Sequence, residues 1–416
     1  MRLRTLLAAT LLALGTAPIA TAAAADPAGC DAQCQWQWDQ QRQNTLPRGT
    51  FYDPPDPLRP APAGTLIRAA FTTEYQVDGA SVGATRILYH SRTSAGRDVA
   101  ASGVLLVPPG RAPRGGWPVV VDAHGTSGMG LDCAPSLMRD LYHGDQMARF
   151  TARGWAVVAP DYAGLGTTGD PEVLNKTAEA EDLVAALRAA HQTRPDLGGR
   201  WVAWGHSQGG GAVLGLAEQQ LRAPEPGYLG AVVTSPAADL ERSLANAVDT
   251  PGLGGFAPLI AAGAQGSDHR IRLDRVLTPA ALSRIDVTRT GCLGVLGAVY
   301  ADLTGTALVR PDYLQEPHFA SYLRRNSTGT RPIGGPLLLL QGTADVIIPQ
   351  AITDDVAARL CGTGARVDYR TYPGLTHDSY PGQSTGIDDG AMPDIIAWVA
   401  DRFAGETVPV HGGCVR

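Results

Sequence analysis

Three residues with the chemistry of a nucleophile, an acid and a base follow one another along the chain. Ser207 lies in "GHSQG", Asp345 in "GTADVIIP" and His377 in "GLTHDS". A serine hydroxyl is a weak nucleophile at neutral pH, but a neutral imidazole can take its proton as the oxygen attacks a carbonyl carbon. A carboxylate then fixes the imidazole tautomer and stabilises its charged form. These residue types predict acyl transfer through an intermediate on Ser207.

The G-x-S-x-G pattern alone does not choose the nucleophile, because it occurs around Ser81, Ser207 and Ser384. A nucleophile elbow needs a buried strand entering, a sharp turn and a helix leaving. Ser207 has all three, since residues 202–204 are typical of a buried strand and residues 212–221 of a helix. Ser81 instead lies in a turn between strand-like runs, and Ser384 lies in a polar loop. We therefore expect Ser207 to be the nucleophile.

The acid and the base are weaker predictions when each is taken alone. Asp345 is also compatible with a turn former at a helix start, and a loop histidine such as His377 is usually a surface group. Together with Ser207 they follow the order Ser, Asp, His on loops that leave successive predicted strands. A catalytic triad on an open parallel sheet with flanking helices requires this order. His411 is the weaker candidate for the base, and Asp378 is the alternative acid.

The negative charge that develops on the attacked carbonyl oxygen needs at least two N–H donors. We expect one to be the amide of Gln208, at the start of the helix after the elbow. The second should follow the strand in "VVVDAHGTSGMG", which favours the amide of Thr126, with Ser127 as the nearby alternative. His124 and His206 lie inside glycine-flanked loop motifs, so we expect them to support turns.

The rest of the chain alternates strand-like and helical patterns. Two alternating runs, 66–75 and 85–107, predict an antiparallel start to a sheet. Short apolar runs typical of parallel strands then follow, and helical patterns such as 178–192 separate most of them. They are "PVVVDA", "WAVVAP", "WVAW", "GAVVTSP", "PLLLLQ" and "ARVDYRTY". The alternation predicts an α/β fold, a mostly parallel central sheet flanked by helices.

Composition changes divide the 416 residues into five segments. Residues 1–25 have two arginines, an apolar run and an A-x-A site, which predicts a signal peptide cleaved after Ala25. Residues 26–64 are rich in Gln, Pro and Trp and are expected to form an irregular arm. The core is expected over 65–239 and 335–416. Between its two parts, 240–334 lacks a good strand, which predicts an inserted helical cap or lid.

The signal peptide places the mature chain outside the cell, and no later run is apolar for the roughly 18 residues that span a bilayer. Without Arg2 and Arg4 the formal charge changes from −6 to −8, which argues against a nucleic-acid partner. The expected partner is a small-molecule or lipid ester substrate, with transient contact at a lipid interface. The oligomeric state is left open.

Six cysteines in an exported chain predict disulfides, for which the sequence leaves 15 pairings open. They are Cys30, Cys34, Cys133, Cys292, Cys361 and Cys414. No C-x-x-C, H-x-x-x-H or H-E-x-x-H spacing occurs, so we expect no metal. "GLGTTG" at residues 164–169 matches G-x-G-x-x-G, but Pro171 follows and no acidic residue ends a second strand. We therefore expect no nucleotide and no other cofactor.

Several motifs together resemble the secretory lipase family of α/β-hydrolases, which includes exported bacterial members and yeast lipases of the lipase A type. They are "FYDPPDPL" followed by "GTLIR", "AHGTSG" with Cys133-Ala134-Pro135, "GHSQGG" and "GTAD". The resemblance implies a serine triad, a lid after the strand that follows the elbow, and carboxylic-ester substrates. It also implies that Cys133 pairs with Cys292 and Cys361 with Cys414, which leaves Cys30 to pair with Cys34.

The resulting expectation is a secreted serine carboxylic-ester hydrolase, a lipase or esterase acting on acyl esters or glycerides. An exported acyltransferase or a serine peptidase would use the same three residues on the same fold. From another class, a catalytically dead hydrolase scaffold could bind lipid. Fold and family do not choose the acyl chain or the alcohol of the substrate.

Overall fold

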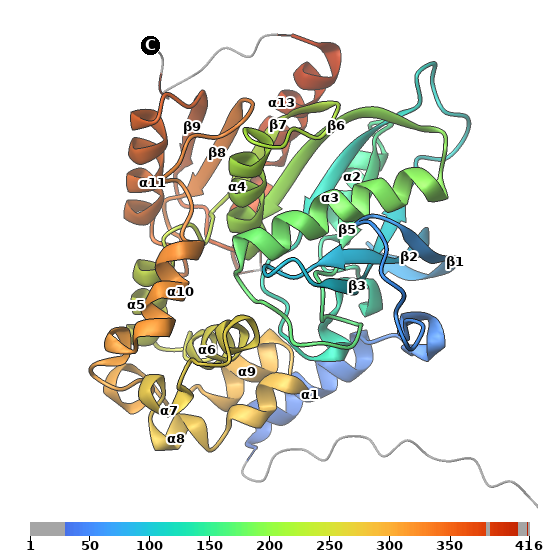
Figure 1. Ribbon diagram of the computed structural model, residues 1–416. Coiled ribbons are helices and arrows are strands. Elements are labelled where there is room, and N and C mark those ends of the chain that lie inside the picture. The colour runs from blue at the N-terminus through green and yellow to red at the C-terminus, as the bar shows by residue number, and fades with distance from the viewer. Residues whose placement is uncertain (1–29, 380–382, 407–413, 415–416) are drawn as a thin grey trace, which may run out of the picture.

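A computed structural model describes residues 30–379, 383–406 and 414 of the chain. The expected signal peptide and His411 lie outside the described residues. The centre is a nine-stranded sheet in the order β1-β2-β3-β5-β4-β6-β7-β8-β9 (Figure 1). Its strands are β1 (Leu66–Val77), β2 (Ala80–Arg92), β3 (Asp98–Leu106), β4 (Trp117–Ala123), β5 (Ala156–Pro160), β6 (Leu197–His206), β7 (Tyr228–Thr234), β8 (Leu337–Gly342) and β9 (Val367–Tyr372).

Strand direction divides the sheet into two parts. Strands β1, β2, β3 and β5 pair antiparallel, whereas β5, β4, β6, β7, β8 and β9 form a parallel series. The antiparallel start and the parallel apolar strands are both as the sequence predicts. The mostly parallel sheet with flanking helices confirms the expected α/β fold class.

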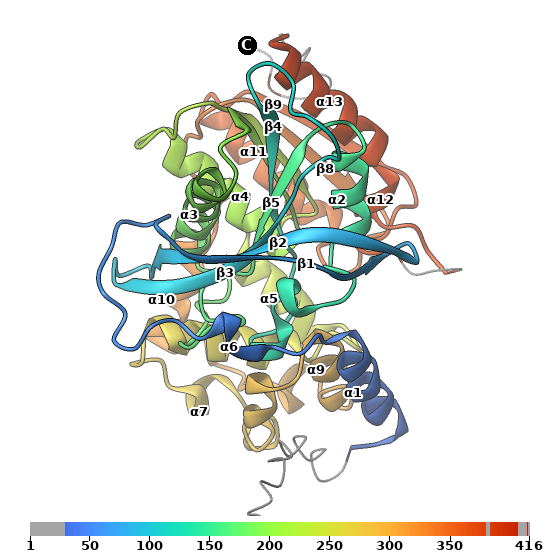
Figure 2. The same cartoon turned by 90° about the vertical axis from the view of Figure 1, so that its right-hand side faces the viewer.

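The central parallel strands are apolar on both faces because helices cover both, whereas the edge strand β9 is partly polar. Side chains alternate across a strand, so Leu337 and Leu339 of β8 face one cluster while Leu338 and Leu340 face another. The first cluster includes α3 (Lys176–Thr193), α4 (Gln208–Gln220) and α11 (Gln350–Gly362). The second includes α2 (Gly144–Thr151), α12 (Ile387–Gly390) and α13 (Met392–Ala404), as Figure 2 shows from the side.

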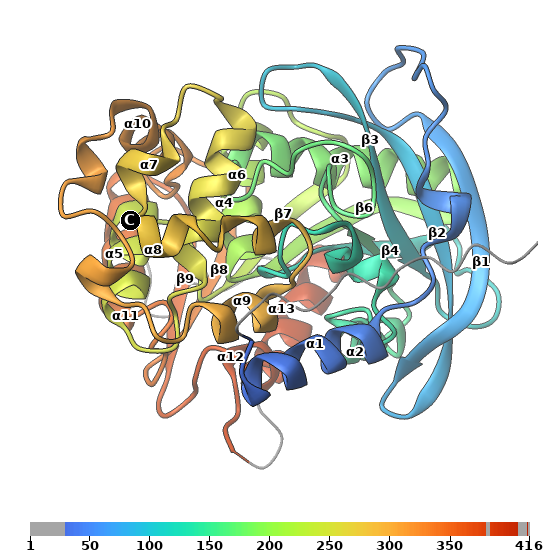
Figure 3. The ribbon, with the colours of Figure 1, turned by 90° about the horizontal axis from the view of Figure 1, so that it is seen from below.

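Between β7 and β8 the chain forms a group of helices with its own apolar cluster. They are α5 (Leu240–Asp249), α6 (Phe256–Ser267), α7 (Leu273–Val276), α8 (Pro279–Leu282), α9 (Leu293–Val299) and α10 (Pro317–Asn326). Seen from below in Figure 3, these helices and α1 (Ala32–Asn44) lie together, and Cys34 and Trp38 of α1 belong to the same cluster. The insertion is thus a packed layer rather than a loose loop.

Helix α1 differs from the irregular arm expected for residues 26–64. Asp31 caps its start by accepting a hydrogen bond from the Cys34 amide at 2.8 Å. At its other end, Gln41 accepts from the Cys292 amide at 2.7 Å and donates to the Thr290 carbonyl at 2.9 Å. The sequence did not reveal the helix because it has almost no apolar periodicity. Tertiary contacts with the insertion hold it instead.

Three disulfides are formed, of which two connect segments that lie far apart in the sequence. Cys133 pairs with Cys292, Cys361 with Cys414 and Cys30 with Cys34. These are the pairings that the family resemblance implies. The first ties the segment after β4 to the start of α9 in the insertion. Within the described residues, none of the helices has the length and apolar character needed to cross a membrane.

Candidate active site

Ser207 lies at a sharp turn between β6 and α4. Its backbone angles are φ 56° and ψ −118°, a strained conformation for a residue other than glycine. Two hydrogen bonds hold the turn: the Ser207 amide donates to the Thr234 carbonyl at 3.0 Å, and the Ala237 amide donates to the Ser207 carbonyl at 2.9 Å. This arrangement is the strand, turn and helix that the sequence pattern indicated.

The other two G-x-S-x-G serines have different surroundings. Ser81 lies within β2, where its hydroxyl donates to the Thr73 carbonyl at 2.6 Å. Ser384 lies in the loop that leads into α12. Of these three described serines, Ser207 alone separates a sheet strand from a following helix.

The glycines around Ser207 are required by close backbone contacts. A Cβ atom on Gly209 would lie 1.8 Å from the carbonyl oxygen of Ala123 at the end of β4. A Cβ on Gly205 would lie 2.3 Å from the carbonyl oxygen of Gly209. Any side chain at either position would push the first turn of α4 away from the sheet. The glycines therefore let the start of α4 approach the loop after β4, which contains Thr126.

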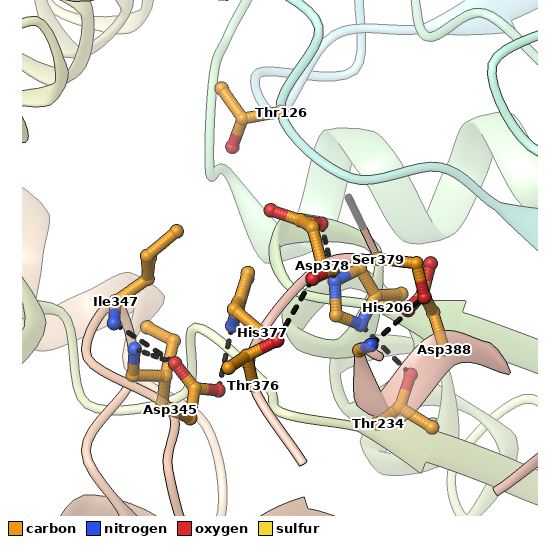
Figure 4. A network of polar contacts seen from close by, with 12 residues as sticks. Thr126, His206, Thr234, Asp345, Ile347, Thr376, His377, Asp378, Ser379 and Asp388 are labelled. Carbon is orange, nitrogen blue, oxygen red and sulfur yellow. Dashed lines mark hydrogen bonds and ion pairs between the residues drawn. The ribbon is translucent and has the colours of Figure 1, made fainter. Parts of the chain in front are cut away.

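Asp345 and His377 form a buried pair. Asp345 follows β8, His377 follows β9, and these two strands are parallel neighbours, so their exit loops meet. Nδ1 of His377 lies 2.7 Å from Oδ2 of Asp345 (Figure 4). The other carboxylate oxygen accepts from the amides of Ile347 and Ile348 at 2.9 and 2.8 Å. These bonds fix the carboxylate. Because Nδ1 is the ring nitrogen that faces Asp345, Nε2 of His377 lies on the side away from it.

The pair shifts the pKa of each partner in opposite directions. Burial alone would lower the pKa of His377, but the charge and hydrogen bond of Asp345 outweigh it and raise this pKa above its ordinary value. Burial would raise the pKa of Asp345, but His377 and the Ile348 amide lower it overall. The geometry therefore favours an imidazolium beside a carboxylate, the charge state in which a histidine holds a proton taken from a substrate or nucleophile.

Ser207, His377 and Thr126 line one cavity of about 1140 Å³. Ser207 is 8% exposed and His377 5% exposed, so both can be reached from the cavity but are otherwise buried. The remaining lining comes mainly from α1, residues 132–143, the start of α6, α9, the loop after His377 and Asp388. The residues predicted for nucleophile, base and second oxyanion donor thus share one space, with Asp345 behind His377.

Two backbone amides near Ser207 are free to bind an oxygen atom. In the described parts of the chain, neither the Gln208 amide nor the Thr126 amide donates a hydrogen bond to another residue. The Ser127 amide, the nearby alternative, is also unpaired within those residues. The side chain of Gln208 donates to Oε1 of buried Glu179 at 2.7 Å. Sequence reasoning missed Glu179, which fixes Gln208 at the start of α4.

A second histidine and aspartate pair lies next to the first. Nε2 of His206 lies 3.3 Å from Oδ1 of Asp378, and its Nδ1 lies 3.1 Å from Oγ1 of Thr234. His206 therefore holds the loop that contains His377, beyond the turn-supporting role expected from its motif. The only sequence signal for this pairing is that each partner adjoins a predicted active-site residue. His124 contacts the carbonyls of Gly125 and Asp161 and supports its turn as expected.

Ligand atoms of His206, His377 and Asp378 lie within 4.8 Å of one another, which is close enough for a metal ion to use all three. Two imidazoles and a carboxylate match the ligands that Zn²⁺ prefers. Each of the three also has a hydrogen-bond partner that explains its position without a metal. The expectation of no metal stays a prediction.

Comparison with known proteins connects this geometry to a family. Residues 145–411, more than half of the chain, match the family model described as secretory lipase. A probable inactive lipase of Mycobacterium tuberculosis is 26% identical over 388 residues, which cover 87% of this chain and 83% of that protein. A secreted triacylglycerol lipase of Malassezia globosa is 22% identical over 405 residues, covering 89% and 82%.

Solved structures show the same fold. Candida antarctica lipase A superimposes with a TM-score of 0.71 at 17% identity, over 88% of this chain and 88% of that one. The rice cell wall degrading esterase LipA from Xanthomonas oryzae has a TM-score of 0.67 at 19% identity, over 83% of this chain and 100% of that one. The fold, the elbow and the family match agree: the chain belongs to the secretory lipase family of α/β-hydrolases.

Proposed function

We propose that the protein is a secreted carboxylic-ester hydrolase that works through an acyl-enzyme on Ser207. The observation that carries the proposal is the strained Ser207 sharing one cavity with His377, whose Nδ1 is bonded to buried Asp345 at 2.7 Å. The strained backbone of Ser207 costs folding free energy, and strain of this kind is concentrated at functional sites. The coincidence of these features favours a working site.

In the proposed reaction, Nε2 of His377 takes the Ser207 proton as Oγ attacks the ester carbonyl carbon. The carbonyl π electrons move to oxygen, and the amides of Gln208 and Thr126 stabilise the charge. The intermediate collapses, its C–O bond breaks, and His377 gives its proton to the leaving alcohol. Water activated by His377 then hydrolyses the acyl-enzyme and restores Ser207. Asp345 stays ionised throughout.

The insertion and the N-terminus have proposed roles of their own. We infer that residues 240–334 act as a cap over the cavity, because the start of α6 and α9 supply part of its lining. Residues 1–25 are proposed to direct export and to be removed after Ala25. The three disulfides support this, since such bonds persist in oxidising compartments.

The relative named as inactive makes the alternative of a dead scaffold worth testing. Here the serine, the acid, the base and the unpaired amides are all present, which favours activity. An acyltransferase would use the same groups to pass the acyl chain to an alcohol instead of water. A peptidase would use them on a peptide instead of an ester. The family match supports an ester substrate over a peptide.

The test is hydrolysis of nitrophenyl esters with acyl chains of two to sixteen carbons by the mature protein. Ser207→Ala should abolish turnover. Ser81→Ala is the matched control, because Ser81 has the same motif but lies in β2 outside the cavity. Turnover in the native protein and in Ser81→Ala, with none in Ser207→Ala, would support the proposal. A folded native protein without turnover, or an active Ser207→Ala, would overturn it.

A further inference from the structure

One wall of the cavity above Ser207 is an amide-rich face of α1. Gln33, Gln37, Gln40 and Asn44 all line the cavity, and they recur at intervals of four, three and four residues. That spacing places them on one side of a helix. An ordinary amphipathic helix has apolar residues in such a stripe. Here the stripe is uncharged but polar, and it faces the space that contains the proposed nucleophile.

Two of these amides are available to a ligand. Gln33 and Gln40 are exposed, and within the described residues neither side chain hydrogen-bonds to another group. Each offers a carbonyl acceptor and two N–H donors. Trp36 lines the cavity beside them with 51% of its surface exposed, one turn from both Gln33 and Gln40. Trp36 thus offers an aromatic face next to free hydrogen-bonding groups.

Helix α1, which carries this amide-rich face, is held rigidly in place. Cys34 and Trp38 are buried in the apolar cluster of the insertion, the Cys30–Cys34 disulfide closes the first turn, and Gln41 bonds to Thr290 and Cys292. Figures 1 and 3 show α1 beside α9. Because α1 is fixed from behind, the backbone positions from which these amides extend are already set, and a ligand that binds them orders only the side chains.

The insertion contributes an apolar part of the lining, and the aspartates Asp132, Asp140, Asp378 and Asp388 line the cavity elsewhere. Leu253 and Phe256 near the start of α6, and Leu293 and Ala298 of α9, present half-buried apolar side chains to the same cavity. The cavity is therefore amphiphilic, with an amide and tryptophan wall on α1 and an apolar wall on the insertion. A ligand that satisfies both walls has an apolar part and an uncharged polar part.

Resting on the proposed ester hydrolysis, we propose that the alcohol part of the substrate is polyhydroxylated, a sugar or a similar polyol. Hydroxyl groups donate and accept, as amides do, so they pair with Gln33 and Gln40 without a charged partner. The apolar C–H face of a pyranose packs on Trp36. The acyl chain lies along the wall formed by α6 and α9. An alkyl alcohol at the same place would bury amides without hydrogen bonds, which costs free energy.

The test compares two esters with the same acyl chain, chosen as the fastest in the nitrophenyl series: a methyl glucoside 6-O-ester and an ethyl ester. We expect kcat/KM for the sugar ester to exceed that for the ethyl ester roughly tenfold, the contribution of one or two hydrogen bonds. Gln33→Leu/Gln40→Leu should lower this ratio by roughly the same factor, through KM. Trp36→Leu should also lower the ratio of the two kcat/KM values.

Gln35→Leu is the matched control, because Gln35 is exposed on the same helix but does not line the cavity. Its ratio should equal that of the native protein. A native ratio of one or less, or an unchanged ratio in Gln33→Leu/Gln40→Leu, would overturn the inference while the ester hydrolysis stands. Failure to hydrolyse either ester or any nitrophenyl ester would instead overturn the proposed function, and this inference with it.

Discussion

Oδ1 of Asp378 lies 3.3 Å from Nε2 of His206, so a second carboxylate is fixed one residue along the chain from His377. The rings of His206 and His377 are 4.6 Å apart between centroids. Burial would raise the pKa of Asp378, but His206 and His377 outweigh it, lower this pKa far below its ordinary value and keep the group ionised. The proposed base thus lies between two carboxylates, with Asp345 bonded to its ring and Asp378 acting through its charge.

Asp345→Asn should remove most of the activity and leave the fold intact. The amide cannot stabilise the imidazolium, and it favours the wrong tautomer of His377, which costs on the order of 10⁴-fold in kcat in a comparable triad. The measurement is kcat with a nitrophenyl ester, with circular dichroism as the check on folding. Near-normal turnover would mean that Asp378 serves as the acid.

The rate should fall on acidification with a midpoint above pH 6.5. His377 must be neutral to accept the Ser207 proton, and its pKa is raised above the ordinary 6.5, so protonation begins at a higher pH than for a free histidine. The check is kcat/KM against pH under first-order conditions. A rate that stays flat down to pH 4 would contradict His377 as the base.

The pair of Asp345 and His377 should keep the protein folded at acidic pH, where protonation of His377 makes it inactive. A raised pKa in His377 stabilises the fold fully below pH 6.5, and this contribution is lost as pH rises through the folded-state pKa. A lowered pKa in Asp345 stabilises it above pH 3.8 and is lost as pH falls. Both contributions are present at pH 5. We expect native circular dichroism there, and full activity after return to pH 8.

Asp378→Asn should move the acid limb of the pH profile to lower pH, because the carboxylate of Asp378 helps to raise the pKa of His377. The fall in kcat at the optimum should be less than roughly tenfold, since Asp345 still holds the ring. Asp389→Asn is the matched control: Asp389 pairs with Arg149 and Gln146 outside the cavity lining. An unchanged profile, or a loss as large as that of Asp345→Asn, would contradict this role.

Removing the Cys133–Cys292 disulfide should cost far more stability than removing Cys30–Cys34. The first spans 159 residues and the second spans four, so the chain-entropy model gives about 5 and about 2 kcal/mol respectively. Paired Cys→Ala variants can be compared by their midpoints of urea unfolding. The first variant should also lose activity, because Leu293 donates to the Ser127 carbonyl at this junction. Equal midpoints would contradict the prediction.

The sheet and the elbow could be read from the sequence because their signals are local. Apolar runs such as those of β4 and β8 are buried on both faces, and only a strand between two helix layers buries them so. Gly205 and Gly209 flank Ser207 because the backbone allows no side chain there. The order Ser, Asp, His then follows from strands whose exit loops share one edge of the sheet.

Helix α1 could not be read in this way. Its polar sequence has no 3.6-residue apolar period, and its stability comes from bonds between Gln41 and the insertion about 250 residues later. The bonds of His206 to Asp378 and of Gln208 to Glu179 are similar cases, since each joins polar side chains far apart along the chain. The spacing of residues along the sequence does not predict such contacts.

The sequence by itself therefore determined the fold class, the identity of the proposed nucleophile, base and acid, and the family. The fold class and the elbow depend on backbone preferences and short apolar patterns, which act between near neighbours in the chain. The acid and the base follow from their order along the chain, and the family follows from the resemblance of several motifs. The tertiary structure alone decided which side chains face the cavity, where amides of α1 meet apolar residues of α6 and α9. The physical reason is that the shape and polarity of a cavity depend on elements that meet only after the chain has packed.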